Sequence, residues 1–140
     1  MIIDSNILIY AINVASPKHK IAQKFLINNL GNLEITHQNI LETIRVLTHK
    51  QFPQPMPLNA TLNAVNNIVN SALIISPNSK TFYLALEFIR VYKLTGNKIF
   101  DAYLASTALS NNIREIATDN VRDFKRYRQI KVNNPFGKIN

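Results

Sequence analysis

The sequence predicts an α/β protein with three layers, in which helices cover both faces of a central parallel sheet of four to five strands. Short apolar runs alternate along the chain with longer segments whose apolar residues recur at helical spacing. Parallel strands need a long crossover connection, usually a helix, so this alternation favours a parallel sheet. At 140 residues and 46% hydrophobic content, the chain is expected to form a single domain over residues 1–140.

Five short apolar segments are the predicted strands. They are residues 1–4, 33–36, 72–76, 115–118 and 130–132. The last of them lies just before Asn133-Asn134-Pro135, so we expect it at the edge of the sheet.

Amphipathic segments fill the intervals between these strands. The predicted helices cover about residues 7–12, 17–30, 37–50 and 58–69, then a helix through 85–92 that ends at Gly96, and one that Asn97 caps. Ser16 as N-cap, Pro17 at the first helical position and Gly31 as terminator indicate the bounds of the second helix. Small residues in the last helix, such as Ala105, would allow it to pack closely on the sheet.

The composition excludes several classes of function. Sixteen Lys and Arg against eight Asp and Glu give a net charge of +8, which favours a polyanionic partner. There is no cysteine, which excludes disulfides, thiolate zinc sites and cysteine nucleophiles. Three glycines are too few for a glycine-rich nucleotide loop. No signal peptide or membrane-spanning run is evident, so we expect a soluble, cytoplasmic protein without membrane contact.

The acidic residues carry the most specific signal. Five of the eight lie at strand ends or near helix starts: Asp4, Glu42, Asp101, Asp119 and Asp123. Ligands of open parallel sheets bind beyond the carboxyl ends of the strands, so four carboxylates can converge there. Crowded carboxylates repel one another, and a hard divalent cation, Mg²⁺ or Mn²⁺, would neutralise them. Together with the basic surface, this predicts hydrolysis of nucleic-acid phosphodiester bonds by a water that the cation activates.

Four short motifs in a fixed order resemble those of a known family. They are Ile3-Asp4-Ser5-Asn6, Asn39-Ile40-Leu41-Glu42, Ile99-Phe100-Asp101-Ala102-Tyr103-Leu104-Ala105 and Ala117-Thr118-Asp119-Asn120-Val121-Arg122-Asp123-Phe124. Over essentially its whole length, the chain resembles the PIN-domain ribonucleases, and among them the VapC-type toxins of toxin-antitoxin systems. The resemblance implies a PIN-like α/β/α fold and a metal-dependent endoribonuclease. It also implies a homodimer and a cognate antitoxin that covers the acidic site.

The resemblance also implies roles for individual residues. Asp4, Glu42 and Asp101 would be catalytic, metal-binding acids, with Asn6 and Thr118 in support. The family often places its fourth acid or amide two residues after the threonine. We expect Asp119 to fill this position, with Asn120 and Asp123 as alternates.

Each of these acids also has an ordinary structural explanation. Asp4 and Asp101 could serve only as a helix cap and as a charge at a helix N-terminus, and Glu42 could pair with Arg45 on its own helix. Asp119 and Asp123 are common turn residues. The shared order of the motifs favours the metal site. His19, His37 and His49 would support metal-free cleavage, but their spacing does not place them together.

A basic stretch near the C-terminus is a candidate RNA-binding surface. It comprises Arg122, Lys125, Arg126 and Arg128, interleaved with Phe124 and Tyr127. Tyr127 is the better candidate for stacking on a base, because the family pattern expects a buried aromatic at Phe124. A solvated edge with two core aromatics fits the same sequence equally well.

The sequence therefore predicts an endoribonuclease that hydrolyses RNA and acts as the toxin of a type II toxin-antitoxin pair. The alternative is a catalytically weak PIN-like module that binds RNA or protein. A phosphoacceptor domain would need a second acid close to Asp4, and Ser5-Asn6 does not supply it.

Overall fold

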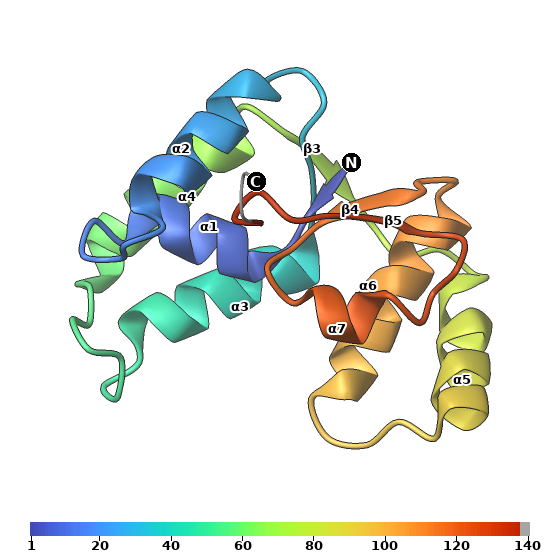
Figure 1. The fold of residues 1–140 in the computed structure, drawn as a ribbon. Coiled ribbons are helices and arrows are strands. Elements are labelled where there is room, and N and C mark those ends of the chain that lie inside the picture. Colours follow the sequence, from blue (N-terminus) through green and yellow to red (C-terminus); the bar gives the residue numbers. More distant parts are fainter. Residues whose placement is uncertain (138–140) are drawn as a thin grey trace.

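The computed structural model describes residues 1–137 and contains a parallel sheet between two groups of helices (Figure 1). The strands are β1 (Ile2–Ile3), β2 (Glu34–Thr36), β3 (Leu73–Ile75), β4 (Glu115–Ala117) and β5 (Lys131–Asn133). The helices are α1 (Ser5–Ile12), α2 (His19–Asn28), α3 (His37–Thr48), α4 (Leu58–Val69), α5 (Thr81–Tyr92), α6 (Lys98–Ser110) and α7 (Val121–Phe124).

The five strands pair in the order β3-β2-β1-β4-β5, and every pair is parallel. The chain runs outward from β1 to β2 and β3, then returns to the other side of β1 and continues through β4 and β5. The direction of winding therefore reverses between β1 and β4. In open α/β sheets this reversal leaves a crevice at the carboxyl ends of the two strands, where ligands bind. The predicted fold class is confirmed.

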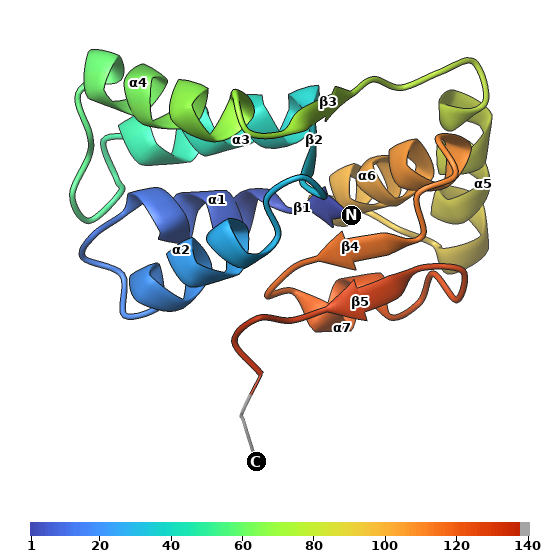
Figure 2. The same cartoon turned by 90° about the horizontal axis from the view of Figure 1, so that it is seen from above.

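Helices α1 to α4 lie on one side of the sheet and α5 to α7 on the other (Figure 2). Successive residues of β1 pack against the helices on opposite faces of the sheet, because side chains alternate between the faces of a strand. Ile3 packs into the core beneath α1 and α2, and Ile2 packs into the core beneath α6. Ala105 in α6 is fully buried against the sheet, as its small size predicts.

Several helix boundaries differ from the predictions. Ser16 and Pro17 precede α2, which begins at His19, because the Ser16 hydroxyl accepts a hydrogen bond from the Lys18 backbone in a turn (3.2 Å). Asn97 flanks α6 without a side-chain capping bond. Asp4 caps α1 by accepting a hydrogen bond from the Ser5 backbone. Within residues 1–137, none of the helices has the length and apolar character that crossing a bilayer requires.

Candidate active site

Asp4 lies at the point where the winding of the sheet reverses. It directly follows β1, and its backbone N–H donates to the carbonyl of Ala117 at the end of β4 (2.9 Å). The side chain is buried and its Oδ1 accepts from the Ser5 backbone N–H (2.8 Å). Asp4 therefore does cap helix α1, but the cap uses only one of its two carboxylate oxygens.

The second oxygen of Asp4 is held by side chains from both sides of the reversal. Oδ2 accepts hydrogen bonds from the Thr118 hydroxyl (2.6 Å) and from the Asn6 amide (2.9 Å). The same Asn6 amide also donates to Thr118 (3.1 Å). Asn6 and Thr118 thus hold the Asp4 carboxylate in one orientation.

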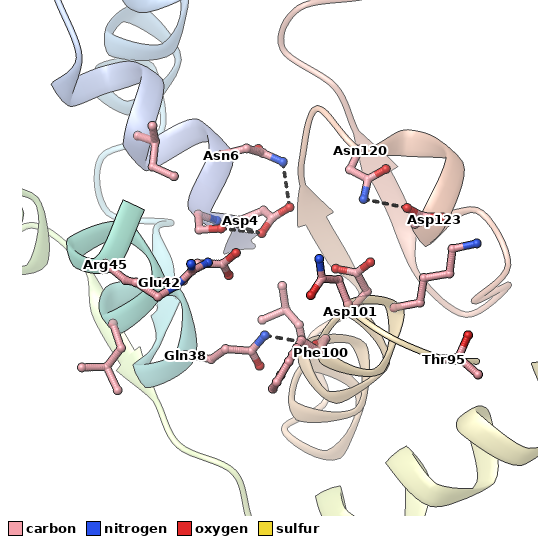
Figure 3. Close-up of a pocket in the computed structure, with 16 residues that line it drawn as sticks. Asp4, Asn6, Gln38, Glu42, Arg45, Thr95, Phe100, Asp101, Asn120 and Asp123 are labelled. Carbon is pink, nitrogen blue, oxygen red and sulfur yellow. Dashed lines mark hydrogen bonds between the residues drawn. The ribbon is translucent and has the colours of Figure 1, made fainter. Parts of the chain in front are cut away.

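Helices α3 and α6 bring further acids to the same opening (Figure 3). Asp101 lies in the first turn of α6, and Glu42 projects from α3. Together with Asp4 and Asp123, they line a pocket of about 850 Å³. Asp4 and Glu42 lie on one side of this opening, with Asp101 and Asp123 on the other.

The electrostatics of the pocket oppose full ionisation. Burial raises the pKa of Asp101 to about 6, and the negative charges of Asp4, Asp123 and Glu42 act in the same direction. Burial likewise raises the pKa of Asp4, although hydrogen bonds from Thr118 and Ser5 act against it. A positive charge in the pocket would relieve this repulsion.

The segment after β4 places Asn120 and Asp123 in the pocket. The Asn120 amide donates to Asp123 Oδ2 (3.0 Å), and Arg126 donates to Asp123 Oδ1 (3.2 Å). The Asn120 backbone N–H donates to the Thr118 hydroxyl (2.9 Å), which links this segment to Asp4. The two residues that the sequence offered as alternates for the fourth position therefore both face the site.

Asp119 does not line the pocket, although we expected it to be the fourth acid. Its Oδ2 forms an ion pair with Lys18 and accepts a hydrogen bond from the Tyr10 hydroxyl (3.1 Å). Lys18 in turn lies over the rings of Tyr10 and Phe136, at 5.1 and 5.2 Å from their centroids. The charge of Asp119 is thus balanced by Lys18, in a cluster that also contains Tyr10 from α1 and Phe136 from the C-terminal segment.

The basic stretch after β4 has several different environments. Arg122, Lys125 and Arg128 are exposed, and Arg126 pairs with Asp123. Tyr127 is only 2% exposed and packs against Phe88, with ring centroids 4.9 Å apart. The prediction that Tyr127 stacks on an RNA base is therefore wrong, because its ring is part of the core.

Sequence reasoning did not assign several other residues that line the pocket, and four of them carry polar, charged or aromatic side chains that matter for the site. These four are Gln38, Arg45, Lys98 and Phe100. A signal was available, because residues three or four positions from an acid share its face of a helix. Gln38 and Arg45 stand in this relation to Glu42, and Lys98 stands in it to Asp101.

The donor set fits a hard divalent cation. The four acids of the pocket offer carboxylate oxygens, which Mg²⁺ and Mn²⁺ prefer. Within residues 1–137, no three acidic or histidine side chains gather closely enough to enclose an ion by themselves. Mg²⁺ commonly uses one or two carboxylates and completes its shell with water and substrate phosphate, so the pocket remains suitable.

The family model described as PIN domain matches residues 1–130, and the chain therefore belongs to the PIN-domain family. The chain is 25% identical to "Ribonuclease VapC37" of Mycobacterium tuberculosis over 140 residues, covering 96% of both chains.

Several solved structures share the fold, and two of them illustrate it. The first is VapBC2 from Rickettsia felis bound to a DNA fragment from its promoter. It has a TM-score of 0.73 and 19% identity, with 95% of this chain and 96% of that chain covered. The second is VapC20 from Mycobacterium tuberculosis, described as a sarcin-ricin loop cleaving toxin. Its TM-score is 0.71 at 10% identity, with 89% of this chain and 93% of that chain covered.

Proposed function

We propose that this chain is a VapC-type endoribonuclease that hydrolyses RNA phosphodiester bonds with Mg²⁺ or Mn²⁺. The observation that carries this proposal is the convergence of Asp4, Glu42, Asp101 and Asp123 on one pocket where the sheet reverses its winding. The curated relative named as a VapC ribonuclease supports it. The net charge of +8 of the whole chain suits a polyanionic substrate.

The acidic and the basic side chains of the pocket would have different roles. Asp4 and Asp101 would hold the cation, with Glu42 and Asp123 completing the acidic wall and accepting hydrogen bonds from water. When bound, the cation would stabilise negative charge on the phosphate and lower the pKa of the attacking water. Asn6 and Thr118 keep Asp4 in one orientation, as outer-shell partners of metal ligands do. Arg45 and Lys98 would contact phosphates next to the scissile one.

For the fourth acidic position we propose Asp123, oriented by Asn120, in place of Asp119. Asp123 lines the pocket and its charge contributes to the raised pKa of Asp101. The carboxylate of Asp119 already has Lys18 and Tyr10 as partners.

Cleavage of a mixed RNA pool tests the proposal. Wild-type protein should cut with Mg²⁺ or Mn²⁺ and stop with EDTA, and D4N, D101N and D123N should each lose activity. D119N is the matched control, since it makes the same chemical change outside the pocket. Cutting that survives EDTA, or that survives all three pocket substitutions, would contradict the proposal.

A second candidate function is an RNA- or protein-binding module that does not cleave. Asp123 favours it, because Asn120 and Arg126 already satisfy both oxygens of this carboxylate. RNA binding by wild-type protein without any metal-dependent cutting would support this alternative.

We also propose that the chain is the toxin of a toxin-antitoxin pair and forms a homodimer. Structural similarity to VapBC2 supports an antitoxin partner. Such a partner would block the acidic pocket, and a basic side chain reaching into it would be electrostatically favoured. Co-expression with the candidate antitoxin should abolish cleavage, and light scattering of the purified protein should give twice the chain mass.

A further inference from the structure

An exposed aromatic ring stands at the edge of the acidic pocket. Phe100 is 60% exposed, although it lies in the first turn of α6 beside the buried Ala102. It lines the pocket and directly precedes Asp101 in the chain (Figure 3). Leu41 is also exposed and lines the same pocket, so the ring is part of an apolar surface at the edge of a charged site, where a ligand can make contact.

The backbone of Phe100 is held from two directions. Its carbonyl accepts a hydrogen bond from the Gln38 amide on α3 (3.1 Å), which joins the two sides of the pocket mouth. Its N–H donates to the carbonyl of Asn97 in the turn that opens α6 (3.0 Å). An anchored platform loses little entropy when a ligand stacks on it.

The surroundings of the ring specify the chemistry of its ligand. Arg45 and Lys98 line the same pocket and would attract negative charge. The ring itself needs a flat apolar surface, and a nucleotide carries both a flat base and a phosphate. An apolar side chain of a protein partner would match the ring but would offer no phosphate to Arg45 and Lys98.

Resting on the function proposed above, we propose that Phe100 is the platform on which an unpaired base of the substrate stacks, next to the scissile phosphate. A base within a duplex is already stacked between its neighbours and does not offer its face. Phe100 would position the substrate and take no part in the chemistry.

Binding measurements in the cleavage-deficient D101N background test this role. The probes are a fluorescein-labelled 12-nucleotide oligouridylate and a 12-nucleotide abasic RNA with the same phosphates but no bases. Anisotropy in Mg²⁺ would compare D101N with added F100L, F100Y or F82L. Phe82 is the matched control, because it is an exposed phenylalanine (59%) on α5, away from the pocket.

The expected result is a loss of affinity that depends on both the ring and the bases. F100L should weaken oligouridylate binding by about tenfold, a typical cost of losing one base–aromatic stack. It should leave binding of the abasic RNA unchanged, F100Y should restore affinity, and F82L should have no effect.

Two results would overturn the inference while leaving the proposed function intact. If F100L binds oligouridylate as well as its parent, the ring is available to a protein partner instead. If F100L weakens both probes equally, the ring acts through the shape of the pocket and not through stacking. If the D101N parent binds neither probe and wild-type protein cuts no RNA, the proposed function fails and this inference fails with it.

Discussion

The pocket that contains Asp101 and the cluster that contains Asp119 are both built on carboxylates, but their neighbours have opposite charges. Asp101 faces Asp4, Glu42 and Asp123, and burial with these negative charges raises its pKa to about 6. Asp119 faces Lys18 and the hydroxyl of Tyr10, and the hydrogen bond to Asp119 raises the pKa of Lys18.

We expect this difference in environment to matter more for the roles of Asp101 and Asp119 than their positions in the sequence motifs. Asp119 pairs with a lysine and should stabilise the fold, whereas Asp101 lies mainly among other acids and should destabilise it until a ligand arrives. Asp119 and Asp123 belong to the same short segment, but their side chains enter the two different environments. Substitutions that remove one charge at a time should therefore have opposite effects on stability in the two regions.

The largest effect is expected from D101N. Cleavage should fall by at least about 100-fold, because even outer-shell changes at metal sites cost 10- to 100-fold. Without metal, the melting temperature should rise by about 3 °C, since the variant removes one of four repelling charges. Added Mg²⁺ should raise the melting temperature of wild-type protein and not that of D101N, because a ligand stabilises only the state that binds it. Thermal shift and RNA cleavage check both parts.

A D101N variant that is less stable than wild-type protein without metal would contradict the description of the pocket as repulsive. Equal stabilisation of both proteins by Mg²⁺ would place the cation elsewhere.

The next effect is expected from T118V, which keeps the size of the side chain and removes the donor to Asp4 Oδ2 (2.6 Å). The free energy of unfolding should fall by about 2 kcal/mol, as for a lost hydrogen bond to a charged group. Cleavage should fall about tenfold, because Asp4 loses part of its orientation.

T43V is the control for T118V. Thr43 is equally buried, but its hydroxyl donates only to the Asn39 carbonyl within α3 (2.7 Å). Urea unfolding and cleavage assays of both variants should show a loss of activity for T118V alone. An equal loss of activity for T43V would mean that the effect comes from lower stability of the whole protein and not from the orientation of Asp4.

A smaller effect is expected from D119N. The free energy of unfolding should fall by about 1 kcal/mol, because Lys18 loses its partner in a half-exposed ion pair. The loss should shrink in high salt, which screens such pairs. RNA cleavage should stay close to that of wild-type protein. Loss of cleavage as severe as that of D101N would show that Asp119 belongs to the active site after all.

The last expected effect is a dependence of stability on pH in the metal-free protein. The pKa of Asp101 is about 6 in the folded state and 3.8 in its ordinary state, so between these values the folded protein holds a proton that the unfolded chain has released. Stability should therefore fall as the pH rises from about 4 to about 6 and then level off. Urea unfolding in EDTA measures the slope, and D101N should reduce it. A slope of the opposite sign would contradict the raised pKa.

The elements that carry the fold could be predicted from local patterns. Apolar runs such as residues 33–36 and 115–118 indicated strands, and helical spacing indicated the helices between them. The boundaries were less predictable, because local hydrogen bonds decide them. The Ser16 hydroxyl forms a turn in place of an N-cap, and α2 begins three residues later.

The sequence by itself determined the parallel α/β class, the place of Asp4 after a strand and that of Asp101 at a helix start, because these follow from short-range periodicity. The tertiary structure alone decided which carboxylates share a pocket. The side chains of the segment after β4 point in directions that depend on partners from distant parts of the chain. Lys18 and Tyr10 surround Asp119, whereas Asp101 on α6 faces Asp123. Similarly, Tyr127 is a core residue because Phe88 and Tyr92 on α5 pack against it. Contacts between such distant residues leave no local pattern in the sequence.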